Sequence, residues 1–426
     1  MEELKRAISK FPDIRTGKNK MYTMEEVALG AFSVFFTQSP SFLAHQQAMK
    51  KLHDNSNAET LFSIKHIPSD NHIREMLDEV SPEVLYSVFD VYRERLKKDG
   101  ILHRFRSINN SYLIAIDGTW YYESKTVHCG KCLKMNHRNM TITYYHSMIC
   151  PVILRPCSDK VISLRPEFIR QQDGNTKQDC EMEAAKRWII SDSEKLGMNI
   201  TFLGDDLYSK EPLCSMLLER RLNFIFVCKP ESHKTLYEWV SGLDKDTGLY
   251  TFENRHRKGR NILSYRYKYA NRIPLRDRDD SLKVNWVELE VTSKEGKRVY
   301  KNGFITNYEI NSENVEEIVE AGRSRWKIEN ENNNVLKTKG YHLEHNYGHG
   351  SKNLSFVLIT LNLLAFQWHT ILDFVDKRYD VIRKELSSRH TFFDDLRALT
   401  RYICFGSWTS LMNFMLDGLK LKVDTS

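Results

Sequence analysis

The hydrophobic positions follow two different periods along the chain. Residues 1 to about 105 are predicted to be helical. Met24 to Phe36 is rich in apolar residues, with Thr23 placed as its N-cap. Residues 72–98 give a second helical pattern, interrupted near Ser81-Pro82. Beyond this region the pattern changes to short β-branched and aromatic runs, which favour strands.

The central part of the chain alternates between such runs and amphipathic stretches. Strands are predicted at 112–116, 140–148, 161–164, 199–203 and 223–227, and helices at 179–195 and 212–220. The resulting order is strand, strand, strand, helix, strand, helix, strand. This order predicts an α/β fold with a mixed sheet and helices on both of its faces.

The later part of the chain departs from this alternation. Residues 232–302 are predicted to form a mostly β insertion, and Gly303 to Thr306 a return strand. A long helix is expected from about Glu313 to Thr338, with Ser312 as its N-cap, and the remainder to about Lys420 is helical. Five regions are therefore predicted: a helical region at 1–105, a catalytic core in two parts at 106–231 and 303–350, the insertion at 232–302, and a C-terminal helical region at 351–426.

Composition narrows the class of protein. Of 426 residues, 41% are hydrophobic and 28% charged, which is typical of a globular chain and argues against a disordered or fibrous one. Eight cysteines in this length do not suggest a disulfide scaffold. The first residues lack an apolar signal segment, and polar residues interrupt the most apolar stretch, Leu354 to Val375. We therefore expect a cytoplasmic protein, a buried helix at Leu354 to Val375, and reduced thiols.

The net charge of +7 arises from one segment. Thr251 to Lys301 contains 14 Lys and Arg against 7 Asp and Glu, and the rest of the chain is balanced. One interpretation is a solvated β surface. The other is a surface that contacts the phosphate backbone of DNA through residues such as Arg255, Arg257, Lys258 and Arg260.

Two predicted strands end in an acid. Asp117 follows the run at 112–116, and Asp205 follows the run at 199–203. Functional groups gather at the carboxyl ends of strands in open α/β sheets. An Asp at such a place can also simply form a turn. Two acids of this kind, each closing an apolar run, favour a metal site.

A third carboxylate is expected on the long predicted helix. At about 100° per residue, Glu329 falls on the same side as Arg325 and Trp326, which we expect to face the sheet, whereas Glu331 falls about 200° away from Glu329. A buried acid is costly unless it is paired or binds a metal. The alternative role for Glu329 is an ion pair with Arg325, one helical turn away.

Three carboxylates from two strands and a helix can bind two Mg²⁺ ions, and Mn²⁺ can substitute. Two such ions stabilise both the attacking and the leaving oxygen of a phosphoryl transfer. Arg325 and Lys337 on the same helix are then candidates for contacts with the DNA phosphates. Trp326 is a candidate for stacking on an unpaired base, although a Trp on a buried face is more often part of the core.

These motifs resemble those of the DDE transposases of bacterial insertion sequences, especially insertion sequence family four, the group with a Tyr-Arg-Glu-Lys signature. The matching stretches are AIDGT with Asp117, LGDDLYS with Asp205, and SRWKIENENNNVLK with Arg325, Glu329 and Lys337. They lie within residues 110–345. The D-x-x-Y/F pattern of the group favours Asp205 over its neighbour Asp206.

The sequence departs from the signature at two places. Gly322 stands where the group has its Tyr, three residues before Arg325, and seven residues rather than six separate Glu329 from Lys337. The resemblance implies an RNase H-like core interrupted by the β insertion, with Asp117, Asp205 and Glu329 as metal ligands and catalytic residues.

The function implied is that of a transposase. Such an enzyme binds the terminal inverted repeats of its element, cleaves DNA by metal-assisted hydrolysis and joins the 3′-hydroxyl ends to target DNA. The expected partner is double-stranded DNA, bound by a homodimer near the bacterial nucleoid, with no membrane and no small-molecule substrate. The alternatives are a catalytically inactive DNA-binding protein derived from a transposase, and a nuclease of the same core without strand transfer.

A separate motif suggests a second metal. Cys129 and Cys132 form a CxxC pair with His137 nearby, which is a partial set of zinc ligands. His146 and Cys150 are further candidates, as are the histidines at positions 342, 345 and 349. The alternative is a pair of reduced cysteines in a turn.

Overall fold

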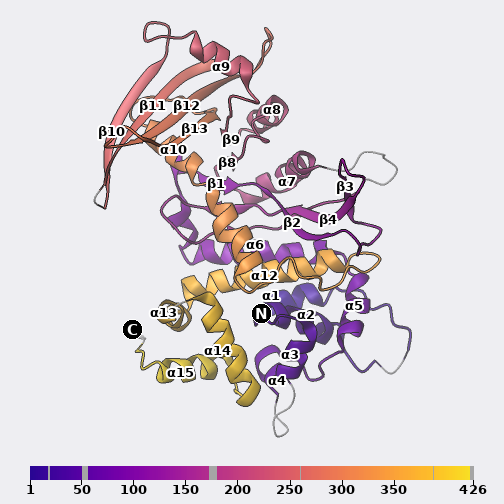
Figure 1. The fold of residues 1–426 in the computed structure, drawn as a ribbon. Helices are drawn as coiled ribbons and strands as arrows, with labels where there is room; N and C mark the ends of the chain where they lie inside the picture. The colour runs from indigo at the N-terminus through magenta and orange to yellow at the C-terminus, as the bar shows by residue number, and fades with distance from the viewer. Residues whose placement is uncertain (18–19, 50–55, 172–179, 260, 387, 423–426) are drawn as a thin grey trace.

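The computed structural model describes residues 1–17, 20–49, 56–171, 180–259, 261–386 and 388–422. A mixed sheet runs through the centre of the molecule, and a large helical body lies against it (Figure 1). The predicted α/β class with a mixed sheet is therefore confirmed.

The main sheet has nine strands in the order β10-β11-β12-β13-β9-β8-β1-β5-β6. β1 pairs with β8, and β8 with β9, in parallel, whereas β5, β6 and β10–β13 pair antiparallel to their neighbours. Their bounds are β1 Tyr112–Ala115, β5 Val152–Leu154, β6 Ile162–Ser163, β8 Ile200–Gly204, β9 Asn223–Val227, β10 Tyr250–Lys258, β11 Asn261–Pro274, β12 Lys283–Ser293 and β13 Arg298–Thr306.

Both faces of the central strands are apolar, which explains their uninterrupted hydrophobic runs. Leu113 and Ala115 of β1 join one hydrophobic cluster with α10 (Val315–Arg323) and α12 (Leu354–Val375). Ile114 and Ile116 join the other, with α7 (Glu181–Leu196) and α8 (Glu211–Glu219). Alternate side chains therefore pack against helices on opposite faces, as expected.

The strands β2, β3, β4 and β7 form a second, smaller sheet. β2 (Gly118–Ser124) and β3 (Leu133–Asn136) both pair with β4 (Ile142–Ile149), and so does β7 (Glu167–Ile169). β1 leads into β2 with only Ile116 and Asp117 between them. Asp117 therefore lies where the chain passes from one sheet to the other.

The N-terminal and C-terminal helices pack together around α12 (Figure 1). Thr23 caps α2 as predicted, with Glu26 completing a capping box. The bounds are α1 Glu2–Ile8, α2 Met24–Phe36, α3 Phe42–Ala48, α4 Asn57–Phe62, α5 Asp70–Asp78, η1 Pro82–Leu85, α6 Tyr86–Lys98, η2 Leu102–Phe105, η3 Ile108–Asn110, α13 Lys377–Glu385, α14 Arg389–Tyr402 and α15 Trp408–Gly418.

Helix α12 was predicted to be buried, and it is. It is long and apolar enough to cross a membrane by length and composition, but 89% of its most apolar window is buried within the protein. It packs against α2, α5 and α6. Such burial is typical of the core helix of a soluble protein.

The long helix predicted at 313–338 is broken in the structure. α10 ends at Arg323 and is followed by a turn; a π-helical segment, η4 (Ile328–Asn333), then leads into α11 (Asn334–Thr338). The N-cap is Asn314, so the prediction of Ser312 was wrong. A π-helical segment changes the angular phase of the residues around it, and such segments are frequent at functional sites.

The basic segment extends the main sheet rather than standing apart from it. β13 pairs with β9 of the core, and β10 lies at the far edge. A helix that the sequence did not predict, α9 (Lys234–Ser241), packs against β11. The long antiparallel strands project from the core at the end opposite the helical body (Figure 1).

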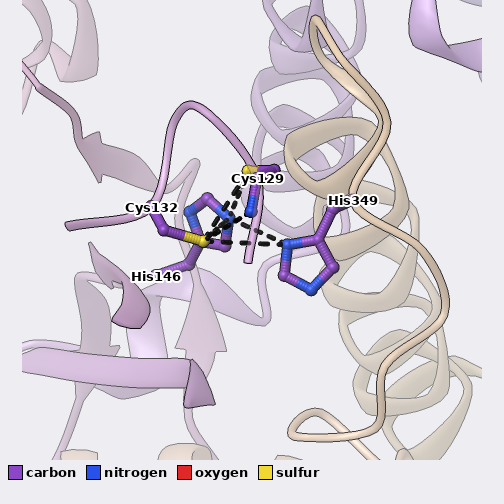
Figure 2. A group of neighbouring side chains, drawn as sticks. All are labelled: Cys129, Cys132, His146 and His349. Atoms are coloured by element: carbon purple, nitrogen blue, oxygen red, sulfur yellow. Dashed lines mark hydrogen bonds between the residues drawn. The ribbon is translucent and has the colours of Figure 1, made fainter. Parts of the chain in front are cut away.

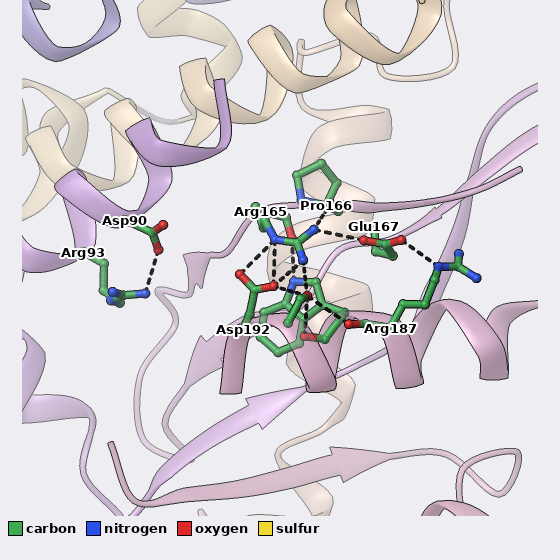
Figure 3. Close-up of polar contacts among 9 residues, drawn as sticks. Asp90, Arg93, Arg165, Pro166, Glu167, Arg187 and Asp192 are labelled. Carbon is green, nitrogen blue, oxygen red and sulfur yellow. Dashed lines mark hydrogen bonds and ion pairs between the residues drawn. The ribbon is translucent and has the colours of Figure 1, made fainter. Parts of the chain in front are cut away.

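A partly buried ion-pair network holds the start of β7 against α7 (Figure 3). The Arg165 guanidinium donates through Nε to both oxygens of Asp192, at 2.8 and 2.9 Å, and through Nη1 to Glu167 at 2.9 Å. Arg187 also donates to Glu167, at 3.0 Å. These bonds raise the pKa of Arg165 against the opposing effect of its burial. The arginine is therefore charged and matched by acids within the protein.

Candidate active site

Asp117 is the most perturbed acid at the carboxyl edge of the sheet. Its pKa is raised to about 7, mainly by burial and then by the charges of Glu181, Glu329 and Asp205, whereas the charge of Arg325 acts to lower it. The three predicted carboxylates are therefore close enough to interact, although they lie far apart in sequence. Like charges held together in this way favour a divalent cation or a shared proton.

Asp205 and Asp206 have different roles. Asp205 follows β8 and accepts a hydrogen bond from the Leu207 N–H at 2.9 Å, and its charge acts on Asp117. Asp206 accepts from the Lys229 N–H at 2.7 Å and from the Ser232 hydroxyl. Asp206 thus stabilises the turn after β9, and Asp205 is the one of the two whose charge raises the pKa of Asp117.

Glu329 pairs with Arg325, at 2.8 Å between Oε1 and Nη1. The expectation of a buried face was wrong, because the side chain of Glu329 is 49% exposed and Trp326 is 44% exposed. Counting 100° per residue fails across a turn and a π-helical segment. Glu331 is partly buried instead, and burial raises its pKa.

Glu181 is a fourth acid that the sequence analysis missed. It is the first residue of α7, accepts from the Gly118 N–H at 3.0 Å and from the Tyr208 hydroxyl at 2.7 Å, and is the strongest charged influence on Asp117. A Cβ atom at Gly118 would lie 2.2 Å from its carboxylate. Only glycine permits this approach, so the Gly that follows Asp117 was the available signal.

The sequence departs from the transposase signature at Gly322 and in the spacing to Lys337, and the structure shows what each of these residues contacts. Gly322 packs against the sheet, where a Cβ would lie 2.9 Å from atoms of Ile225 and Phe304, so no tyrosine fits there. Lys337 pairs with Glu344 at 2.8 Å between Nζ and Oε1, rather than with an acid of the site.

Two of the predicted DNA-contact residues, Arg255 and Arg257, lie on the edge strand of the insertion, β10. Arg255 and Arg257 are exposed and occupy alternate positions of β10, which places them on one face. Arg260 and the side chain of Lys258 lie outside the described part of the chain. Part of the charge is balanced locally, because Arg266 pairs with Glu253 at 2.6 Å and Lys301 with Glu288 at 3.1 Å.

The predicted zinc set Cys129, Cys132 and His137 was wrong in its third member. His137 is exposed, and its Nε2 lies 2.8 Å from the Thr143 hydroxyl. The register of β3 and β4 pairs Leu133 with Tyr145 and so brings His146 beside Cys132. His146 and His349 join the two cysteines (Figure 2), whereas His342, His345 and Cys150 do not.

The donor set at the sheet edge fits Mg²⁺ in its chemistry. Asp117, Asp205 and Glu329 offer hard oxygen ligands, and a divalent ion would offset their repulsion. They are more widely spaced than the cysteine and histidine cluster. That cluster is the only group of three or more acids, histidines or cysteines in the described residues whose ligand atoms all lie within 4.8 Å of one another.

Comparison with known proteins identified no relative of this chain. No protein-family model matches the chain, and a search of curated proteins found no match either.

Proposed function

We propose that this chain is a DDE transposase that uses Mg²⁺ to cleave the ends of its element and join them to target DNA. The observation that carries the proposal is the placement of Asp117 and Asp205 after the adjacent parallel strands β1 and β8, with the charge of Glu329 also acting on the pKa of Asp117. Three acids chosen from sequence motifs thus interact electrostatically. Perturbed acids of this kind are typical of catalytic sites.

The topology supports an RNase H-like core. Strands β6, β5 and β1 are antiparallel neighbours, and β1, β8 and β9 are parallel ones. Two of the acids follow adjacent parallel strands, at the edge where α/β sheets commonly bind ligands. The third is on the broken helix that packs on the same sheet.

Each of the site residues would have a separate role in DNA cleavage. Asp117, Asp205 and Glu329 would hold Mg²⁺ or Mn²⁺, which lowers the charge on the scissile phosphate and activates a hydroxyl nucleophile. Arg325 presents a guanidinium beside Glu329 and can donate two hydrogen bonds to a phosphate oxygen pair. Exposed Trp326 is available to stack on an unpaired base.

The remaining expectations belong to the same proposal. The DNA duplex would contact the exposed arginines of β10, two copies of the chain would act together on the element's ends, and the protein would work in the bacterial cytoplasm. Two alternatives remain: a DNA-binding derivative without catalysis, and a nuclease that cuts without strand transfer. Terminal inverted repeats on either side of the gene would favour the transposase.

The test uses DNA that carries the sequences flanking the gene. We expect cleavage to require Mg²⁺ or Mn²⁺. Asp117→Asn, Asp205→Asn and Glu329→Gln should each abolish cutting and retain DNA binding, because each removes a metal ligand and leaves the basic surface intact. Glu331→Gln is the matched control on the same helix and should cut normally.

The outcomes separate the alternatives. Binding without cleavage by the wild-type chain would favour the inactive derivative. Cleavage without joined products would favour the nuclease. Normal cutting by Glu329→Gln together with loss in Glu331→Gln would reject the choice of the third acid.

A further inference from the structure

Four side chains from three separate segments converge at the smaller sheet. Cys129 and Cys132 lie in the connection between β2 and β3, His146 lies on β4, and His349 lies between α11 and α12. Figure 2 shows the two sulfur atoms and one nitrogen of each ring pointing toward a common centre. Cys132 and His146 are each only 1% exposed.

Five of the six distances between the ligand atoms are close to the edges of a tetrahedron around a metal ion. The two Sγ atoms are 3.7 Å apart, each lies 3.4 Å from His146 Nε2, and His146 Nε2 lies 3.2 Å from His349 Nδ1. Cys132 Sγ lies 4.0 Å from His349 Nδ1. With Zn–S bonds of about 2.3 Å and Zn–N bonds of about 2.0 Å, tetrahedral edges are about 3.8 Å for S–S, about 3.5 Å for S–N and about 3.3 Å for N–N.

Ordinary bonding does not account for this arrangement. The sulfur atoms are too far apart for a disulfide, and all eight cysteines are free. His146 Nε2 is within 3.4 Å of three potential partners, yet one ring nitrogen has either one proton or one lone pair. A cation at the centre would satisfy all four groups together.

We propose that Cys129, Cys132, His146 and His349 form a structural zinc site. Two thiolates and two imidazoles select Zn²⁺ over the hard cations that suit the carboxylates of the candidate active site. All four tetrahedral positions are filled by protein ligands, so none is open for substrate. The backbone N–H of Cys129 also donates to Cys132 Sγ at 3.3 Å.

The site joins parts of the chain that are more than 200 residues apart, since 203 positions separate His146 from His349. β2 begins directly after Asp117, and His349 follows the broken helix that carries Glu329. The segment that follows His349 is held by Asp78, whose carboxylate accepts hydrogen bonds from the N–H groups of Ser351 and Lys352 at 2.8 and 2.9 Å. Zinc would therefore fix the connection between the core and α12. This role is independent of the proposed activity.

The test begins with the full chain purified without added metal. We expect about one zinc ion per chain by elemental analysis, as a closed four-ligand site requires. A strong chelator should remove it, lower the melting temperature and make Cys129 and Cys132 reactive toward an alkylating reagent. Co²⁺ added to the zinc-free protein should give thiolate-to-metal absorption bands and a tetrahedral visible spectrum.

Variants locate the ligands. Cys129→Ser and His349→Ala alter the two less buried ligands, and each should lose most of the bound zinc. His137→Ala is the matched control and should retain it, because His137 bonds to Thr143 instead. His349→Ala protein that keeps a full complement of zinc would overturn the four-ligand assignment.

Two results with the wild-type chain would reject the zinc site itself. One is folded protein with reduced thiols that contains no zinc and takes up neither Zn²⁺ nor Co²⁺. The other is protein that contains iron in place of zinc. Because these readouts are metal content and spectra, they stand whether or not the chain cleaves DNA.

Discussion

Asp117 shows how a single residue can serve a site at the expense of stability. Its carboxyl is partly buried at the junction of two sheets, and the charges of three other acids raise its pKa while that of Arg325 lowers it. A residue chosen for stability would be neutral here. The raised pKa of Asp117 therefore makes the stability of the metal-free fold depend on pH.

We predict that Asp117→Asn stabilises the metal-free protein, and more so as pH rises. A raised folded-state pKa of about 7 contributes stability below the unfolded-state pKa of 3.8, and that stability is lost as pH rises through 7. Between about pH 5 and about pH 8.5 the advantage of the variant should grow by about 3 kcal/mol, since about two pKa units lie between pH 5 and the folded-state value and each is worth about 1.4 kcal/mol. Denaturant-induced unfolding of both proteins at the two pH values measures this difference in the free energy of unfolding.

Added Mg²⁺ provides the control for this prediction. At about pH 8.5 the ion should stabilise the wild-type chain, because it relieves the repulsion among the acids, and should do much less for Asp117→Asn. If Asp117→Asn is less stable than the wild type at high pH, the prediction is wrong. The ionised carboxylate of Asp117 would then be stabilised by its neighbours even without a metal.

At the scale of elements, the sequence predicted what depends on local pattern. The runs 112–116 and 199–203 match β1 and β8 within one residue, because strands buried on both faces require unbroken apolar residues. The broken helix was not predicted. No residue between 313 and 338 is a proline that would mark a break. Gly322, just before the turn, lies close against Phe304, a contact that the sequence pattern does not reveal.

The broken helix separates the two basic residues of the signature. Arg325 contacts Glu329, whereas Lys337 contacts Glu344 beyond the end of α11. We predict that Arg325→Lys slows cleavage of pre-bound DNA at least about tenfold, because the loss of one charged hydrogen bond costs about 1.5–3 kcal/mol. Lys337→Arg should cut at nearly the wild-type rate.

Both variants preserve charge, so both should fold and bind DNA normally, which circular dichroism and binding assays can check. Equal and small effects on the cleavage rate would demote Arg325 to a structural partner of Glu329. A large loss in Lys337→Arg alone would assign the phosphate contact to Lys337.

At the scale of the whole molecule, the sequence predicted the proximity of Asp117 and Asp205 but not the cysteine and histidine cluster. Asp117 and Asp205 each end a strand, so their meeting follows from the parallel pairing of β1 and β8. His146 and His349 join Cys132 through a strand register and through the path of the chain before α12. Neither the strand register nor the chain path produces a fixed spacing between ligands in the sequence. The prediction of His137, the histidine nearest to Cys132 on its C-terminal side, was therefore wrong.

The last prediction concerns the basic edge of the extended sheet. β10 is an edge strand far from the helical body, and Arg255 and Arg257 are exposed on one of its faces. Reversing both charges, in Arg255→Glu with Arg257→Glu, should weaken DNA binding about equally for all sequences, because phosphate contacts carry no sequence information. The slope of log affinity against log salt should fall in magnitude by about 2, since each phosphate that the protein no longer neutralises removes roughly one unit. The paired lysine substitutions Arg255→Lys and Arg257→Lys keep the charge and should keep the slope. An unchanged affinity and slope in the reversed variant would mean that this edge of the sheet is only a solvated surface, and that DNA is held elsewhere on the molecule.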